Sequence, residues 1–553
     1  MNFSTFSKYL QKLEGIASRN EMTIVLAEMF TEASAEDARL LAYLSQGKLG
    51  PAYKSPDFGI ADKSMVKALG ADAEKLFKEK GDLGLVAQEL NKGKGNLSVK
   101  EVYEKLWDIA TISGTGSQDK KQQLIINFLD EVDPVSAKYV VKIILGKLRT
   151  GFSDMTMLDS ISWMLVESKK LKTQIEAMYN VRADLGEIIM QVKQHKQPRQ
   201  LEPEIGTPIL MAKGERAVTS LEIWERLDKC AVEYKLDGLR IQANIGDTIT
   251  LFSRGLENVT SMYPDIVDGL RKQIKHKCIV EGEMIALDKK GKFLPFQETV
   301  QRKRKYDILE MLESVPLKIF LFDILFIDGK SLLNIPNEER RQILEKNITS
   351  GNTVELMTRE VVLSAEKIEK FFQKSLRDGT EGIFAKKLDG GYAAGSRDFN
   401  WIKYKKSYQK SALADTLDVV VMGYDEGQGK RSKFGIGDFL AGVYEPKTDK
   451  YLTFAKIGTG LTDGEWIKIK KLLSPINKKP ENYEVSKAME CDHWVEPKLV
   501  VEILADEITK SPMHTSNYAL RFPRLVSFRE KKPTDATTMQ ELEKMFKLQQ
   551  IGR

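Results

Sequence analysis

The sequence predicts a multidomain α+β protein, because three regions of the chain differ in their hydrophobic patterning. At 553 residues the chain is too long for a single hydrophobic core. Apolar residues recur at three- and four-residue intervals over 1–195, whereas short β-branched runs alternate with helical intervals over 205–406. Short strands joined by glycine-rich turns then fill 413–553. We therefore expect an all-α region, a mixed α/β region and a small β-barrel.

The first region, 1–195, is expected to be helical throughout. Its N-terminal segment places four apolar side chains at helical spacing: Phe3, Phe6, Leu10 and Leu13. A later helix should begin at Asp133-Pro134, since aspartate caps a helix and proline suits its first turn. That helix and the turn after it carry four basic residues: Lys138, Lys142, Lys147 and Arg149. Basic helices of this kind suit phosphate contacts, although a solvated helix face is an equal alternative.

A polar, proline-containing segment, 194–204, is expected to be a linker to the second region. The second region contains the apolar strands ITLFSR, CIVEGEMIAL and LKIFLFDILFID, with helical segments between them. The third region has about five short strands with polar turns, which predicts a β-barrel of the OB-fold type. A final helix is expected over 535–548.

Composition and charge narrow the function classes. The net charge of +6 is spread over 85 basic and 79 acidic residues, which permits a polyanionic partner without requiring one. The three cysteines (Cys230, Cys278 and Cys491) match no zinc spacing, and only four histidines are present. A reducing, intracellular location is therefore expected. No apolar run reaches the length of a membrane span, so we expect no membrane association.

The segment AVEYKLDGLR, 231–240, is the most informative part of the chain. A β-branched and aromatic run leads into Asp237-Gly238, and the chain then resumes with strand-forming residues. This pattern predicts strand, tight turn, strand, with Lys235 at the end of the first strand. A lysine on a rigid strand end is a candidate nucleophile if its amine loses its proton. The alternative is an ordinary solvated turn.

Charged residues recur on later strands of the same region. Glu281 and Glu283 interrupt an apolar strand and share a face by alternation. Two neighbouring carboxylates repel each other, and a divalent cation is the expected resolution. A third carboxylate, Glu381, lies between turn residues and a strand, and Lys403 and Lys405 lie on one face of another strand. Each could instead be a solvated turn or a charged residue that protects an edge strand.

Taken in order, KLDGLR, SRG, EGE, LFDILFIDG, EGIFAKK and KYK resemble the nucleotidyltransferase motifs of ATP-dependent DNA ligases. RFPRLVSFREKK near the C-terminus resembles the last motif of that set, and the similarity covers essentially the whole chain. The resemblance implies a helical DNA-binding domain over 1–195, an adenylation domain over 205–406 and an OB domain over 413–553. It also implies ATP and Mg²⁺ as cofactors and nicked double-stranded DNA as substrate. We expect a monomer in the cytoplasm or nucleoid, or in the nucleus if the source is a eukaryote.

The resemblance assigns a role to each matching residue. Lys235 is the nucleophile that accepts AMP, Glu233 meets the adenine amino group and Phe322 stacks on the base. Arg240 and Arg254 contact the ribose-phosphate or the 5′-phosphate of the nick. The remaining assignments are Glu283 to ribose or metal, Glu381 to metal, and Arg397, Lys403 and Lys405 to phosphate. DNA contacts by Lys138, Lys142, Lys147 and Arg149 are expected from the pattern of their helix and turn, not from the resemblance.

Two further segments match known motifs only in part. The last motif of the family runs Arg-x-Asp-Lys, whereas this chain has Arg529, then Lys531 at the aspartate position, then Lys532. Arg529 and Lys532 are expected to close over ATP. The second segment begins at Gln122 and runs Gln-x-x-Ile-x-x-Phe-Leu, which partly resembles a sliding-clamp-binding peptide. Its apolar residues suit a core-facing helix equally well.

Two other functions compete with this interpretation. RNA ligases and capping-type nucleotidyltransferases also use a Lys-x-Asp-Gly nucleophile, but they usually lack a helical region of this size before it. A non-catalytic nucleic-acid-binding protein built from helical and OB modules would not need Lys235, Glu283 and Glu381 together. The sequence therefore favours a DNA ligase.

Overall fold

The computed structural model describes the whole chain except residues 17, 149, 303–314, 407–415, 428 and 552–553. The described residues form two compact units. One unit consists of Met1–Glu215, Lys229–Val362 and Ala385–Ile402, and the other of Arg216–Asp228, Leu363–Phe384 and Lys403–Arg553. The predicted start of the third domain, residue 413, lies outside the described residues.

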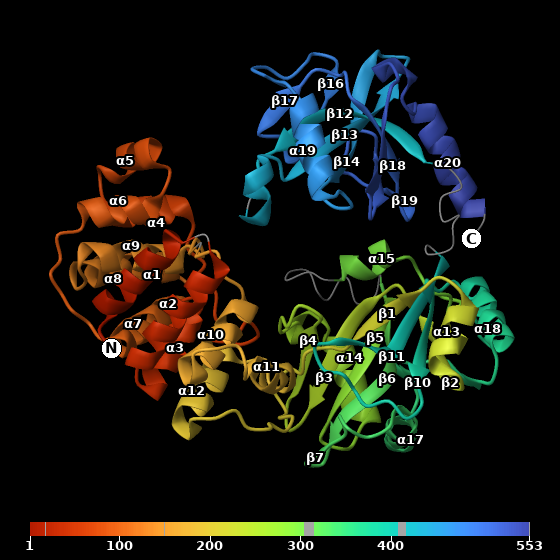
Figure 1. Cartoon of the computed structure of the whole chain (residues 1–553), viewed down its shortest axis with the longest axis horizontal. Helices are drawn as coiled ribbons and strands as arrows, with labels where there is room; N and C mark the ends of the chain where they lie inside the picture. The colour runs from red at the N-terminus through yellow and green to blue at the C-terminus, as the bar shows by residue number, and fades with distance from the viewer. Residues whose placement is uncertain (17, 149, 303–314, 407–415, 428, 552–553) are drawn as a thin grey trace. The chain divides into compact units, whose positions relative to one another are not determined.

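The first 195 residues form a helical region, as predicted (Figure 1). Its helices are α1 (Phe3–Glu14), α2 (Arg19–Glu32), α3 (Ala35–Leu44), α4 (Asp62–Leu69), α5 (Ala73–Lys80), α6 (Leu83–Leu90), α7 (Val99–Thr111), α8 (Ser117–Asp130), α9 (Pro134–Ile144), α10 (Asp154–Val166), α11 (Lys172–Val181) and α12 (Leu185–His195).

Local sequence explains where these helices begin and what they bury. Asp133 caps α9, its side chain accepting hydrogen bonds from the backbone of Val135 and Ser136. The predicted apolar stripe of α1 is buried, since Phe6, Leu10 and Leu13 have no exposed surface. These residues belong to one continuous core that includes side chains from α1 to α12.

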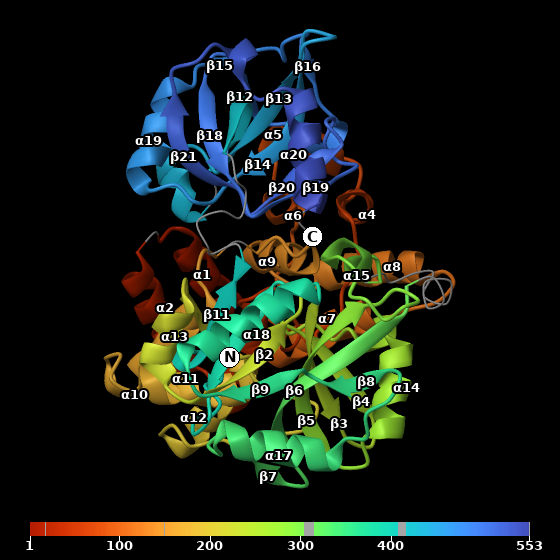
Figure 2. The same cartoon turned by 90° about the vertical axis from the view of Figure 1, so that its right-hand side faces the viewer.

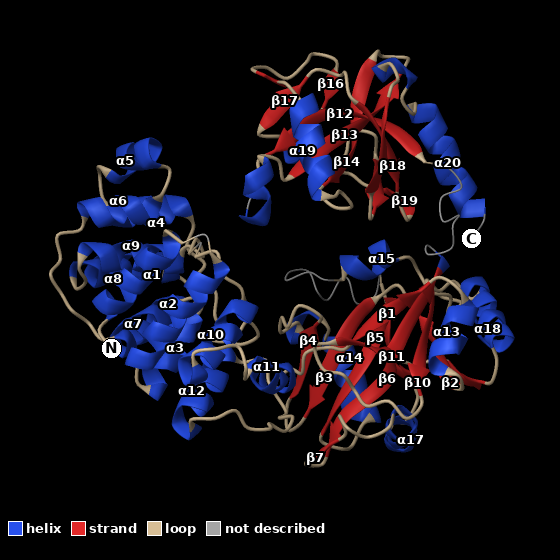
Figure 3. Ribbon diagram, viewed as in Figure 1, coloured by secondary structure: helices blue, strands red, loops and turns tan. Residues whose placement is uncertain are grey.

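Two β-sheets follow the helical region (Figure 3). The first has the strand order β1-β11-β10-β2-β9, with β1 (Lys213–Ala217), β2 (Cys230–Lys235), β9 (Arg359–Val362), β10 (Gly382–Lys387) and β11 (Arg397–Lys405). The second has the order β4-β3-β5-β6-β7, with β8 parallel to β6; its strands are β3 (Leu239–Ile245), β4 (Ile249–Ser253), β5 (Cys278–Ala286), β6 (Leu317–Ile327), β7 (Lys330–Ser331) and β8 (Val354–Leu356).

Helices accompany these sheets, which confirms the predicted mixed α/β texture. They are α13 (Ser220–Leu227), α14 (Pro264–Gln273), α15 (Phe296–Gln301), α17 (Asn337–Asn347) and α18 (Ala365–Arg377), with a 3₁₀ turn at Thr260–Met262. One core joins β3, β5 and β6 to Leu270 of α14 and Leu344 of α17. A second core, on the side of β5 and β6 that faces β11, contains Leu325, Tyr392 and Trp401. The apolar side chains between β11 and the six-stranded sheet therefore form a core separate from the one that contacts α14 and α17.

The C-terminal part is rich in strands, as predicted. Its main sheet has the order β15-β17-β12-β13-β14-β16, with β18 pairing to both β12 and β21, and β19-β20 form a separate hairpin. The strands are β12 (Leu417–Asp425), β13 (Asp438–Glu445), β14 (Lys450–Ile457), β15 (Pro475–Ile476), β16 (Tyr483–Glu484), β17 (His493–Val495), β18 (Val500–Leu504), β19 (Glu507–Lys510), β20 (Tyr518–Arg521) and β21 (Arg524–Arg529).

Two helices flank the main sheet of the C-terminal part on opposite sides, as the two views in Figures 1 and 2 agree. They are α19 (Asp463–Leu472) and α20 (Met539–Ile551); 3₁₀ turns occur at Gly429–Phe434, Lys487–Met489 and Pro533–Asp535. The final helix begins four residues later than predicted. Thr538 and Glu541 bond each other's backbone N–H groups, and this reciprocal cap fixes the start of α20.

Candidate active site

Lys235 lies at the C-terminal end of β2, as predicted, but the turn after it does not form a hairpin. β2 belongs to the five-stranded sheet and β3 to the six-stranded sheet. The Asp237-Gly238 turn therefore carries the chain from one sheet to the other. Lys235 is half-buried, whereas the side chains before it on β2 are buried.

Close packing against β5 explains why position 238 of this motif is a glycine. A Cβ atom at Gly238 would lie 2.2 Å from the backbone oxygen of Met284 on β5. Real Cβ atoms do not approach backbone so closely, so any larger residue would push the turn away from β5. Gly282 on β5 meets the same restriction, because a Cβ atom there would lie 2.8 Å from the backbone oxygen of Phe320.

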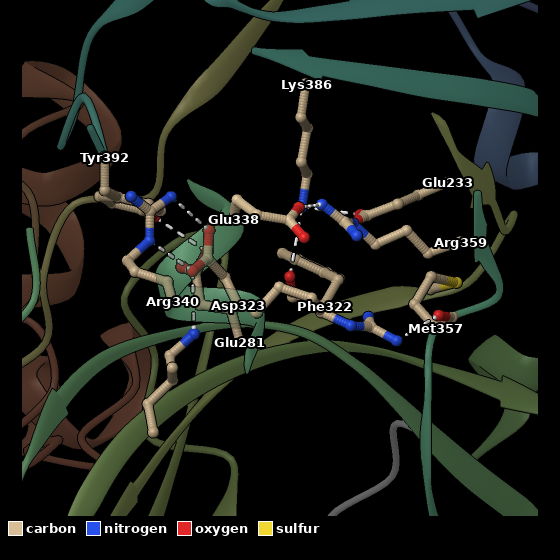
Figure 4. A network of polar contacts seen from close by, with 12 residues as sticks. Glu233, Glu281, Phe322, Asp323, Glu338, Arg340, Met357, Arg359, Lys386 and Tyr392 are labelled. Carbon is tan, nitrogen blue, oxygen red and sulfur yellow. Dashed lines mark hydrogen bonds and ion pairs between the residues drawn. The ribbon is translucent and has the colours of Figure 1, made fainter. Parts of the chain in front are cut away.

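Glu233, two residues before Lys235, is the centre of a buried polar network (Figure 4). One of its carboxylate oxygens, Oε2, forms an ion pair with the Lys386 amine of β10 at 2.7 Å. The Arg359 guanidinium lies 3.8 Å from its other oxygen and also pairs with Glu338. Burial lowers the pKa of Lys386, against the opposing effects of the Glu233 and Asp323 carboxylates.

Phe322 lies beside this network because of a β-bulge. In the β5–β6 ladder Glu281 faces Asp323 and Gly282 faces Leu321, so Phe322 is the extra residue of β6. A bulge redirects a side chain, and Phe322 packs edge-to-face on Trp401 with ring centroids 5.9 Å apart. The Lys386 amine lies 4.7 Å from the Phe322 ring centroid and 4.2 Å from that of Trp401.

Arg240 balances the charge of Glu281, and this corrects one expectation. Glu281 is fully buried, with hydrogen bonds from Arg240 at 2.6 Å and from the Tyr392 hydroxyl at 2.9 Å. The expectation that a divalent cation offsets both carboxylates is therefore wrong for Glu281, whose charge is balanced by the Arg240 guanidinium. Despite burial, the Glu281 carboxylate raises the pKa of Arg240. Glu283 is half-buried and faces Arg240 in the β3–β5 ladder.

Asp323, the residue after Phe322 on β6, forms a second buried ion pair with Arg340. Arg340 of α17 donates to both carboxylate oxygens of Asp323, at 2.8 and 3.0 Å, and neither side chain exposes more than 1% of its surface. Burial alone would raise the pKa of Asp323, but the Arg340 and Lys386 charges lower it overall. This pair holds α17 against the strand that carries Phe322.

The remaining predicted ligands of the nucleotide and metal lie on strands or next to them. Glu381 pairs with Lys405, whereas Arg397 is exposed at the start of β11 and Arg254 in the turn after β4. Lys403 is half-buried on the same face of β11 as Lys405, as alternation predicted. Among the residues that the structure describes, no group of three or more histidine, cysteine or acidic side chains is arranged to hold a metal ion.

The basic residues predicted to bind DNA are engaged within the helical region. The Lys138 and Lys142 amines lie 2.5 and 2.8 Å from Glu14, and both lysines are nearly buried. Lys147 is exposed and pairs with Asp62 at 2.6 Å. Arg149 lies outside the described residues. DNA contact by these residues stays a prediction.

The C-terminal motif and the clamp-like segment also have defined places. Lys531, at the position where aspartate is usual, pairs with Asp418 of β12 at 2.5 Å, and Arg529 lies 3.3 Å from the same carboxylate. Lys532 is exposed. In the clamp-like segment the apolar side chains are buried in the helical core: Ile125, Phe128 and Leu129. That packing does not support clamp binding through this segment.

Sequence reasoning missed the partners that complete the buried network. Lys386, Trp401 and Tyr392 contact the predicted residues, but none of the three was given a role, although Lys386 lies inside the quoted motif EGIFAKK. One signal was available for Asp323, because an acid inside the apolar run IFLFDILF requires a partner. That signal did not identify Arg340.

In the described part of the chain, no helix has both the length and the apolar character needed to cross a bilayer.

Comparison with known proteins covers the whole chain. Residues 2–162 match the family described as "DNA ligase N terminus", 214–405 match "ATP dependent DNA ligase domain" and 432–532 match "ATP dependent DNA ligase C terminal region". The chain is 41% identical to a "Probable DNA ligase" of Dictyoglomus turgidum, covering 99% of this chain and 98% of the relative. It is 36% identical to "DNA ligase 2" of Thermofilum pendens, covering 99% and 97%.

A solved structure has a similar fold. The structure titled "Pmar-Lig_PreS3" covers 95% of this chain and 99% of its own, with a TM-score of 0.55 and 16% identity. At that identity the likeness concerns the fold alone.

Proposed function

Because this chain belongs to the ATP-dependent DNA ligase family, we propose that it seals nicks in duplex DNA through a lysyl-AMP intermediate. The Lys235 amine forms a bond to the α-phosphorus of ATP, and the bond to pyrophosphate breaks. AMP then passes to the 5′-phosphate of the nick, and the adjacent 3′-hydroxyl displaces AMP to form the phosphodiester. The observation that carries this proposal is the position of Lys235, two residues from the buried carboxylate of Glu233 on one strand.

The residues between the two sheets are proposed to bind the nucleotide. Glu233 accepts a hydrogen bond from the adenine amino group, and Phe322 stacks on the base, which is worth about 1–3 kcal/mol for an aromatic face. Arg240 and Arg254 are proposed to contact the sugar-phosphate or the 5′-phosphate of the nick. Arg240 is held at 2.7 Å from the backbone oxygen of Ala212, which fixes its guanidinium.

Mg²⁺ is part of the proposal, because carboxylates are the protein ligands that this ion takes. Magnesium commonly takes one or two protein carboxylates and completes its shell with substrate phosphates and water. Glu283 and Glu381 would supply those carboxylates, so a larger acidic cluster is unnecessary. When bound, the ion would stabilise negative charge that develops on the phosphates. Arg397, Lys403 and Lys405 are proposed to contact the same phosphates.

Duplex DNA is the proposed substrate of the helical and C-terminal parts. Lys147, Arg149 and, if their pairing to Glu14 loosens, Lys138 and Lys142 are proposed to contact its phosphates. We assign 1–195 to DNA binding, 205–406 to adenylation and 413–553 to the OB domain, whose Arg529 and Lys532 close on ATP. A monomer in the cytoplasm or nucleoid, where DNA is found, completes the proposal.

Transfer of label from α-labelled ATP to the protein tests the proposal. The unmodified protein should become labelled in the presence of Mg²⁺, and Lys235→Ala should not. Lys229→Ala is the matched control, because Lys229 is exposed immediately before β2. Labelling of Lys235→Ala at the normal rate would refute the mechanism.

Substrate preference tests the second part of the proposal. The adenylated protein should join a nick in duplex DNA faster than a nick in duplex RNA. The reverse preference would favour an RNA ligase, which uses the same lysine chemistry. Absence of joining on both substrates, with labelling intact, would favour a capping-type nucleotidyltransferase.

A further inference from the structure

The two oxygens of Glu233 have different environments. Oε2 pairs with the Lys386 amine at 2.7 Å. Oε1 is buried and has no hydrogen-bond donor within the described part of the chain; the nearest cation, Arg359, lies 3.8 Å away. A buried carboxylate oxygen without a donor costs free energy. Such an atom between two sheets is suited to a donor on a ligand.

The position of Lys386 is fixed on every side. Its side chain exposes 1% of its surface, and its amine also donates to the backbone oxygen of Phe322 at 3.3 Å. The faces of Phe322 and Trp401 lie under the same amine. Lys386 therefore cannot turn toward water, and its charge is directed at Glu233.

We infer that Lys386 is a positioning residue that sets the choice of nucleobase, by holding one oxygen of Glu233 and leaving the other to accept a hydrogen bond from an exocyclic amine. This inference rests on the proposed nucleotide site. An ionised carboxylate only accepts hydrogen bonds, so it matches the 6-amino group of adenine and repels the 6-carbonyl group of hypoxanthine or guanine. The selected substrate class is therefore 6-aminopurine nucleoside triphosphates.

Loss of the Lys386 charge should change this selection in a specific way. Without the Lys386 amine, Glu233 loses the contact that fixes Oε2, and its carboxyl group can rotate. A rotated carboxyl group no longer presents Oε1 to the 6-amino group of adenine and no longer opposes the 6-carbonyl group of hypoxanthine. Selectivity between the two bases should then fall, in addition to any general loss of activity.

The test compares self-adenylation with ATP and the corresponding reaction with inosine triphosphate, whose bases differ in the 6-substituent and the N1 proton. In Lys386→Met the ratio of the two kcat/KM values should fall about tenfold, because the well-placed hydrogen bond to a charged acceptor that is lost contributes a factor of about that size. Lys387→Met is the matched control, because Lys387 is exposed on the same strand and pairs with Asp389. Its ratio should not change.

A second background separates positioning from packing. If Lys386 acts through Glu233, then Lys386→Met should leave the ratio unchanged in a Glu233→Gln protein, whose side chain needs no cation. Equal slowing with both nucleotides and an unchanged ratio would mean a merely structural role for Lys386 and would overturn the inference. If Lys386→Met does not fold, Lys386→Gln, which keeps polar atoms but no charge, replaces it with the same expected ratio. Failure of the unmodified protein to react with ATP would refute the proposed function instead.

Discussion

Breaking the Asp323–Arg340 ion pair should destabilise the packing of α17 on β6, the strand that carries Phe322. Arg340→Met removes two hydrogen bonds to Asp323 and the Arg340 contacts to the Ile335 and Gly390 carbonyls. Both charged groups are essentially without exposed surface, so the buried Asp323 charge would lose its hydrogen-bonded partner. Loss of one member of such a pair costs about 3–5 kcal/mol.

Amide hydrogen exchange in the intact chain measures this cost locally. Peptides from β6 and α17 should exchange about 10²–10⁴-fold faster in Arg340→Met, the factor that corresponds to about 3–5 kcal/mol. Lys346→Met, on an exposed position of the same helix, should change exchange by less than about threefold. A double variant, Asp323→Leu with Arg340→Met, should recover most of the loss because apolar side chains replace both charges.

The pH dependence of the same experiment has a defined sign. Arg340 helps to hold the pKa of Asp323 below its ordinary value, so the pair contributes stability above that value and loses it as the solution becomes more acidic. In Arg340→Met the carboxyl group becomes easier to protonate, and the deficit should shrink from pH 7.5 to pH 5. A deficit under about 1 kcal/mol at pH 7.5, or a double variant worse than the sum of the single ones, would refute this reasoning.

Three further predictions follow from particular contacts. Lys121 is buried, donates to the Phe58 backbone oxygen at 2.6 Å and has a pKa lowered by burial, so unfolding takes up a proton between its folded pKa and about 10.4. The thermal stability of the unmodified protein relative to Lys121→Met should therefore rise from pH 7 to pH 10; a constant difference would contradict this. Gly238→Ala should lower self-adenylation and cost about 1–3 kcal/mol, because its Cβ atom would collide with the Met284 backbone oxygen; the control Gly464→Ala, which meets no atom within 4 Å, should not. Asp418→Asn should lower stability in 50 mM salt by about 0.5–1 kcal/mol, because Arg529 and Lys531 are partly exposed partners. That loss should disappear in 0.5 M salt, and persistence would mean that the contact is not electrostatic.

Local patterns predicted elements whose causes are local. The start of α9 depended on Asp133 and Pro134, which are adjacent in sequence, and the buried face of α1 followed from its spacing of apolar residues. The strand, turn and strand around Lys235 were also predicted, but the sequence did not show that the two strands join different sheets. A turn sequence shows that two strands are close in the chain, but the partners of each strand decide which sheet it joins.

The same difference between local and distant causes applies to the buried charges. The sequence indicated that Glu281 needs a counter-charge, and the structure supplies Arg240, 41 residues earlier. It did not indicate that the basic residues of α9 would pair with Glu14, which is 124 residues before Lys138. An apolar context shows that a charge requires a partner, whereas the identity of that partner depends on packing between distant segments. Lys386 was missed for this reason, although it lies inside a quoted motif.

The chemistry proposed for this site depends on how exposure changes along β2. Glu233 and Lys235 share one face of the strand, since side chains alternate, but Glu233 is 2% exposed whereas Lys235 is half-buried. Recognition of a base by a carboxylate requires exclusion of water, because water would compete for the same hydrogen bond. A nucleophilic amine must instead reach a phosphate that enters from solvent. Because β2 ends at Lys235, it provides a buried carboxylate and a more exposed amine within two residues. Changes at Lys386 should therefore alter the choice of nucleotide without displacing the Lys235 amine.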